Sequence, residues 1–153
     1  MEIVPNEWLL DYMRLDADKE KASIAIQFLN TIVKKCDKLV IKRTSPFIKK
    51  FYHYFEESNI DTKCHKIFVD LFDLLVIDSN KTIIVDNGDI KKLPKEIEGK
   101  TPSDDKYLIE LAYSYPDRVI VTTDQRLKEK LKDEGDLKIY LLEEFLEQYL
   151  SNN

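Results

Sequence analysis

The chain has 153 residues, of which 24 are Lys or Arg and 29 are Asp or Glu, so its formal net charge is −5 at pH 7. With 43% hydrophobic and 35% charged residues, the composition is that of a globular protein and excludes a disordered or fibrous one. The length fits a single domain, 1–153, with one buried core. The apolar runs are too short to span a bilayer and the first residues lack a secretion-signal pattern, so we expect a cytoplasmic protein without membrane contact.

Glycine is scarce, and its positions exclude two phosphate-binding motifs. The three glycines, Gly88, Gly99 and Gly135, are too far apart for the G-x-G-x-x-G fingerprint or the P-loop. Both motifs need closely spaced glycines so that the backbone can approach a phosphate group. The sequence also lacks G-x-S-x-G and H-E-x-x-H, which are common hydrolase signatures.

Short apolar runs alternate with longer amphipathic segments along the chain. The runs lack strict alternation, as is typical of strands covered on both faces, and they lie at 3–4, 39–41, 82–85, 119–121 and 137–140. Apolar residues at three- and four-residue spacing predict helices around 22–33, 47–55, 64–75, 108–115 and 142–149. The stretch 86–101 contains Asn-Gly, Pro and Gly and is predicted to be a turn-rich connection. This order predicts an α/β fold, a three-layer α/β/α sandwich with a mainly parallel central sheet.

Acidic residues lie where an expected strand ends or an expected helix begins. Glu7 comes after the first strand, Asp104 and Asp105 open a helix, and Asp124 ends the run Val-Ile-Val-Thr-Thr-Asp. Ligands of an open parallel sheet bind outside the carboxyl ends of its strands, so these acids are candidates for a binding site.

Helix capping is the competing interpretation for most of these residues. Thr101 with Asp104 fits a capping box, Asn6 fits the N-cap of the helix that holds Trp8, and Asp124 fits the N-cap of the next helix. Asp105 is not needed as a cap, which favours another function for it.

Two segments carry a resemblance to a known family. Asp105-Lys-Tyr-Leu-Ile-Glu-Leu-Ala112, followed by Val119-Ile-Val-Thr-Thr-Asp124, resembles the C-terminal half of a PIN domain. That family is a compact α/β/α nuclease fold whose members typically cut RNA with Mg²⁺ or Mn²⁺ held by clustered acids. The specific motifs lie within residues 101–131, and the order of the other elements also fits.

The resemblance implies a set of site residues. Asp105 and Asp124 are expected to hold the metal ion, and Glu7 and Asp104 to complete the acidic patch, with Asp105, Asp124 and Glu7 as the catalytic carboxylates. Carboxylate oxygens suit hard divalent cations, and a bound ion lowers the pKa of a water molecule. Two residues are expected to support the site, Thr122 by orienting the strand end or a water and Asn6 as a neutral contributor.

The first half of the chain departs from the family pattern. The Asp that ends the first strand in PIN domains is replaced here by Pro5 or Asn6, and a second acidic position falls on Lys49 and Lys50. At an effective dielectric near 20, a unit charge about 4 Å from an ion is worth about 4 kcal/mol. The departures therefore predict weak Mg²⁺ or Mn²⁺ binding unless Glu7 compensates.

A basic segment precedes and enters the predicted helix 47–55. Lys42, Arg43, Lys49 and Lys50 are candidates for contacts with nucleic-acid phosphates. The alternative is a set of solvated helix ends without a ligand, and the acidic net charge argues against a broad nucleic-acid surface.

These observations support three hypotheses. The first is a divalent-metal-dependent, PIN-like endoribonuclease that hydrolyses RNA phosphodiesters. For such a protein the resemblance implies a toxin-type role, a small antitoxin-type protein partner and a homodimer. The second is a degenerate, non-catalytic PIN-like module that binds protein or RNA. The third is an unrelated α/β domain that binds a small ligand at the same strand ends.

Overall fold

A five-stranded sheet forms the centre of the protein. In this computed structural model residues 1–151 are described, so the last two residues of the predicted domain 1–153 lie outside the description. The strands run in the order β3-β2-β1-β4-β5 and every neighbouring pair is parallel. Their bounds are β1 Glu2–Pro5, β2 Lys38–Lys42, β3 Thr82–Val85, β4 Val119–Thr122 and β5 Lys138–Leu141. All five strands predicted from the apolar runs are confirmed.

Strand β1 occupies the middle of the sheet and creates a switch point there. Ile3 of β1 lies opposite Leu39 of β2 on one side and Val119 of β4 on the other. The chain first moves outward from β1 through β2 to β3, and later returns to the other side of β1 with β4 and β5. Where the strand order reverses, connections leave in opposite directions and open a crevice at the carboxyl ends. In this protein the strand order reverses at β1, so the switch point lies beyond the carboxyl ends of β1 and β4.

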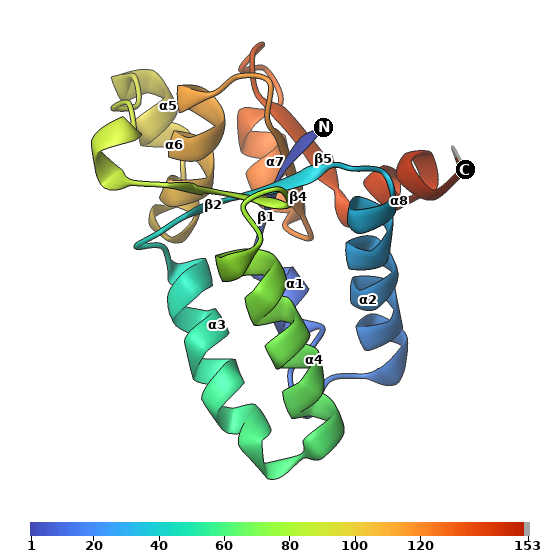
Figure 1. The fold of residues 1–153 in the computed structure, drawn as a ribbon. Coiled ribbons are helices and arrows are strands. Elements are labelled where there is room, and N and C mark those ends of the chain that lie inside the picture. The colour runs from blue at the N-terminus through green and yellow to red at the C-terminus, as the bar shows by residue number, and fades with distance from the viewer. Residues whose placement is uncertain (152–153) are drawn as a thin grey trace.

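Helices cover both faces of the sheet, which confirms the predicted three-layer α/β/α arrangement. Helix α6 packs on β1, β2 and β4, and α7 packs on β5 and α5. The remaining helices lie on the opposite face, where α3 and α4 form a hairpin that extends away from the sheet (Figure 1). The helices are α1 Trp8–Asp11, α2 Lys19–Lys34, α3 Pro46–Glu57, α4 Thr62–Phe72, α5 Lys95–Lys100, α6 Lys106–Ser114, α7 Gln125–Leu131 and α8 Leu142–Ser151.

The core explains why these strands are continuously apolar. Ile3 and Leu39 are fully buried because helices cover the sheet on both sides. On the face opposite α6, the ring of Phe28 in α2 packs edge-on against Trp8 at 5.3 Å and Phe145 of α8 at 6.1 Å between ring centroids. This aromatic group joins α1, α2 and α8 under the central strands.

The connection from β3 to α6 differs from the prediction. It contains the short helix α5 as well as turns, and Thr101 does not cap α6. The Thr101 hydroxyl instead donates a hydrogen bond of 2.7 Å to the Ile97 carbonyl at the end of α5, which also accepts the Thr101 backbone N–H at 3.0 Å. A 3₁₀ turn, Ser103–Asp105, then leads into α6.

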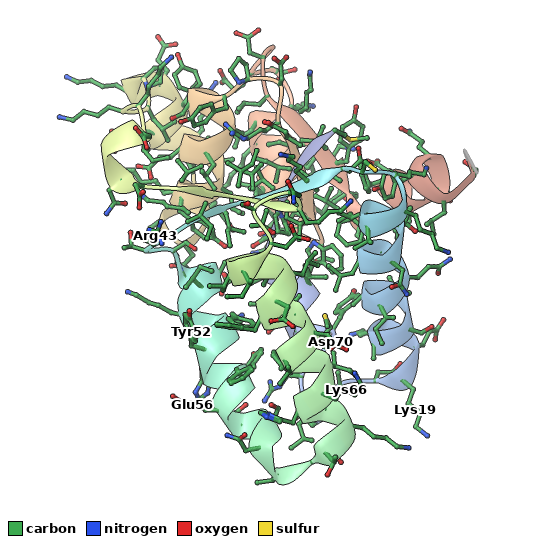
Figure 2. The ribbon with its side chains drawn as sticks, viewed as in Figure 1. Lys19, Arg43, Tyr52, Glu56, Lys66 and Asp70 are labelled. Atoms are coloured by element: carbon green, nitrogen blue, oxygen red, sulfur yellow. The ribbon has the colours of Figure 1, made fainter. Side chains whose placement is uncertain are left out.

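Two further features concern helices α3 and α4. Arg43 lies where β2 leads into α3, and Lys66 and Asp70 lie along α4 (Figure 2). Helix α4 continues into one π-helical turn, Asp73–Ile77.

Within residues 1–151, no helix combines the length and the apolar character needed to cross a membrane.

Candidate functional site

The carboxyl ends of β1 and β4 are joined by hydrogen bonds around Asn6 and Thr122. The Asn6 amide nitrogen Nδ2 donates to the Thr122 hydroxyl at 3.0 Å, and the Asn6 backbone N–H donates to the Val121 carbonyl at 3.2 Å. The Trp8 indole N–H donates to the same Val121 carbonyl at 2.8 Å. Asn6 is 9% exposed and Thr122 is fully buried. These bonds hold the segment after β1 against the segment after β4.

The same pair positions acidic residues after both strands. The Thr122 hydroxyl also accepts the Asp124 backbone N–H at 3.1 Å, and Asn6 accepts the Glu7 backbone N–H at 2.6 Å. The Asn6 side chain forms a further hydrogen bond to Asp105, which lies in the turn before α6. The predicted supporting residues are thus bonded to each other and to the predicted ligands.

Four acidic residues meet at this place: Glu7, Asp104, Asp105 and Asp124, here called the acidic cluster. Burial raises the pKa of Asp105, and the negative charges of Asp124, Glu7 and Asp104 raise it further, in that order, while the hydrogen bond from Asn6 lowers it. Because a charge acts on a pKa only at short range, the structure brings together the four acids that the sequence singled out.

Asp124 also caps helix α7, as the competing interpretation predicted. Its Oδ1 accepts the backbone N–H groups of Arg126 at 2.8 Å and Leu127 at 3.2 Å. Both bonds use one carboxylate oxygen. A capping function and a ligand function are compatible, because a carboxylate has two oxygens and about four acceptor positions.

Tyr107 is a buried residue of the site that the sequence reasoning missed. Its side chain is 7% exposed, and its hydroxyl has no hydrogen-bond partner among the described residues. Burial raises the pKa of Tyr107, and the charges of Glu7 and Asp105 raise it further. A buried hydroxyl without a partner is costly, so a ligand oxygen or a water is the expected partner. In the sequence, Tyr107 looks like any apolar residue of α6.

Lys50 approaches the acidic cluster from α3. Its ammonium lies 3.1 Å from Oε1 of Glu7 and 3.2 Å from Oδ1 of Asp11. Asp11 also accepts a hydrogen bond of 2.7 Å from the Tyr54 hydroxyl. The sequence had identified Lys50 only as a departure from the family pattern and as a phosphate contact, so its pairing with Glu7 is a new observation.

The side chains of the acidic cluster do not form a ready-made three-acid metal site. Between residues 1 and 151, no group of three or more His, Cys, Asp or Glu side chains is arranged to hold a metal ion. Glu7 pairs with Lys50, and Asp124 turns one oxygen to the start of α7. Mg²⁺ commonly uses only one or two carboxylates and completes its shell with waters and phosphate oxygens. The oxygen donors, the raised pKa of Asp105 and the unpartnered Tyr107 hydroxyl fit such an ion.

The predicted basic residues lie at the same edge of the sheet but are mostly paired. Lys42 forms a salt bridge of 3.1 Å with Glu110, and Arg43 forms one of 2.6 Å with Asp86. Lys49 is exposed and has no ion pair within the described part of the chain. These pairs reduce the positive potential that the four basic residues were expected to offer to RNA.

Comparison with known proteins adds no assignment. No family model matches the chain, and neither the curated proteins nor the solved structures include a significant match. The PIN-like assignment therefore stays a prediction that depends on the two sequence segments.

The junction between Asn6 and Thr122 can be tested by stability. Thr122→Val keeps the side-chain shape but removes the hydroxyl that serves Asn6 and Asp124, so unfolding in urea should show a loss of about 1–3 kcal/mol. Thr123→Val, at the exposed neighbouring position, should change stability by less than about 0.5 kcal/mol. Equal effects of the two substitutions would contradict a special contribution of the hydroxyl.

The raised pKa of Asp105 predicts a pH-dependent stability. Because its pKa is raised in the folded state, the folded protein binds more protons than the unfolded one above about pH 4, and stability is lost as the pH rises through this range. Asp105→Asn should therefore be more stable than the parent at pH 7, and the difference should vanish in acid. Thermal unfolding at both pH values measures this, with exposed Asp117→Asn as the control that should show no such gain.

Proposed function

We propose that this protein is a PIN-like, Mg²⁺- or Mn²⁺-dependent endoribonuclease that hydrolyses RNA phosphodiesters. The observation that carries the proposal is the acidic cluster at the β1/β4 switch point, where burial and then three other carboxylates raise the pKa of Asp105. A bound cation stabilises a carboxylate most strongly when other negative charges surround it, because the cation offsets the repulsion between those charges. Acidic groups whose pKa is shifted by burial and by neighbouring charges are typical of functional positions.

The chain offers two direct ligands and a set of residues that orient them. Asp105 and Asp124 would hold the ion, and Glu7 and Asp104 would act at longer range or through water. Asn6 orients Asp105 by its hydrogen bond, and Thr122 orients the backbone of Asp124. When bound, a divalent ion supplies Lewis acidity that activates a water molecule and polarises the phosphodiester.

The Tyr107 hydroxyl is the remaining polar group of the site. It keeps its proton at physiological pH because burial and the neighbouring charges raise its pKa. It is therefore a hydrogen-bond donor, and a phosphate oxygen or the attacking water is a suitable acceptor. Donors that are fixed before the reaction stabilise developing negative charge at little cost in reorganisation.

RNA as the substrate class rests on the family resemblance and on the basic residues at the carboxyl edge. Lys49 is free for a phosphate contact, and the ion pairs of Lys42 and Arg43 with acids would have to exchange for phosphate. We propose single-stranded or loop RNA as the substrate. The toxin-type role, an antitoxin-type partner and a homodimer are carried by the resemblance alone.

One observation favours the non-catalytic alternative, a PIN-like module that binds protein or RNA. The Lys50 ammonium already pairs with Glu7, so one carboxylate of the acidic cluster is neutralised within the protein. In that case the remaining acids would bind a divalent ion too weakly for catalysis. Metal binding and cleavage decide between the two functions.

Calorimetric titration with Mn²⁺ and Mg²⁺ is the first test. We expect saturable binding in the parent protein and its loss in Asp105→Asn and Asp124→Asn, because each substitution removes a ligand charge while Asn still caps α7. Asp117→Asn should bind as the parent does. The parent should also cleave a single-stranded RNA, and both cluster variants and EDTA should abolish cleavage. Cleavage that persists in EDTA, or no binding at millimolar metal, would contradict the proposal.

Tyr107→Phe separates a catalytic donor from a merely buried hydroxyl. Removing a hydroxyl without a partner should leave the stability of the metal-free protein unchanged or raise it by up to about 1 kcal/mol. RNA cleavage should fall about a hundredfold if the hydroxyl stabilises charge in the transition state. Tyr113→Phe on the same helix should retain parent activity. An active Tyr107→Phe variant would remove Tyr107 from the mechanism.

A further inference from the structure

Lys50 is a cation paired with two acidic side chains of the segment that follows β1. Its side chain is 28% exposed, and its ammonium contacts two carboxyl groups, Glu7 at 3.1 Å and both oxygens of Asp11 at 3.2 and 3.3 Å. The Tyr54 hydroxyl donates to the same Oδ1 of Asp11 and fixes its orientation. An ammonium has three N–H donors, and these three carboxylate oxygens can take all of them, so a phosphate oxygen would replace one of the two Asp11 contacts.

Glu7 links this cation to the acidic cluster. The Glu7 backbone N–H donates to the Asn6 side chain, whose amide donates to the Thr122 hydroxyl that accepts the Asp124 backbone N–H, and the Glu7 side chain pairs with Lys50. The ammonium is therefore one carboxylate away from the proposed metal ligands. In a two-metal site, the second divalent ion shares a carboxylate with the first. The Lys50 ammonium lies among acids in the place that such a second ion would take.

Only one of two adjacent lysines has this position. Lys49 and Lys50 follow each other on α3, and neighbouring residues of a helix point about 100° apart. Lys49 is exposed, whereas Lys50 is turned to Glu7 and Asp11. The contrast provides a charge-matched control within one helix turn.

We propose that Lys50 takes the place of a second divalent ion, so that the protein binds one metal ion and Lys50 supplies the other positive charge to the phosphate. This inference rests on the proposed nuclease function. Phosphodiester hydrolysis needs positive charge near both the attacking and the leaving oxygen, which many nucleases provide with two ions about 4 Å apart. An ammonium is a point charge that binds phosphate oxygens and can serve in place of one ion.

Metal stoichiometry tests this assignment without relying on activity. Calorimetry and native mass spectrometry with Mn²⁺ should give one ion per parent chain and two per Lys50→Glu chain, because the substitution replaces a cation by a ligand. Lys49→Glu makes the same charge change on the exposed side and should keep one ion. If Lys50→Glu does not fold by circular dichroism, Lys50→Gln decides: it should bind its single Mn²⁺ about tenfold more tightly than the parent.

A second measurement tests the phosphate contact. In EDTA, a fluorescent single-stranded RNA should bind Lys50→Gln more weakly than the parent, and the slope of log K against log salt should become shallower by about 0.7, the value for one lost contact. An unchanged slope would overturn the phosphate contact.

The possible results separate the inference from the function on which it rests. Two ions in the parent would overturn the role of Lys50 and leave the nuclease proposal standing. One ion in both the parent and a folded Lys50→Glu protein would also overturn it, and the ion pairs of Lys50 with Glu7 and Asp11 would then be structural only. No ion in the parent would overturn both proposals.

Discussion

The hydrogen bond between the Asn6 amide and the Thr122 hydroxyl is the contact on which the site depends. It joins the ends of β1 and β4, which are far apart in the sequence and adjacent in the sheet. Through the same two side chains, the backbone of Glu7, the backbone of Asp124 and the carboxylate of Asp105 are held in place. Both residues are buried, so the bond is protected from competition with water.

Concentrating acids at this point costs stability, and the fold offsets the cost only in part. Lys50 pairs with Glu7 and Asp11 and offsets one of their two negative charges, and the N-terminus of α7 stabilises Asp124. Asp105 receives one hydrogen bond from Asn6 and remains under the repulsion of three carboxylates. The charge that is left uncompensated is what a cation would bind, so stability and the proposed function oppose each other at this residue.

The distribution of positive charge separates the active from the inactive interpretation. Lys42 and Arg43 are held by acids outside the acidic cluster, whereas Lys50 is held by an acid within it. A cation inside the cluster either competes with a metal ion or works beside it. The active interpretation requires that Asp105 and Asp124 can still bind one divalent ion while Lys50 is paired with Glu7. The inactive interpretation requires that they cannot.

The sequence by itself determined the five strands, the main helices and the α/β class, because apolar periodicity reflects local geometry and burial. It also singled out Asp105, which opens a helix, and Asp124, which follows a strand, as candidate ligands, and that assignment stays a prediction. It did not reveal α5, whose short span lacks a strong period, or the true function of Thr101 at the end of that helix. Only the tertiary structure decided that Asn6 bonds to Thr122, that Tyr107 lacks a partner within the described residues and that Lys50 pairs with Glu7. Those contacts join segments that are distant in the chain, so no local pattern in the sequence records them.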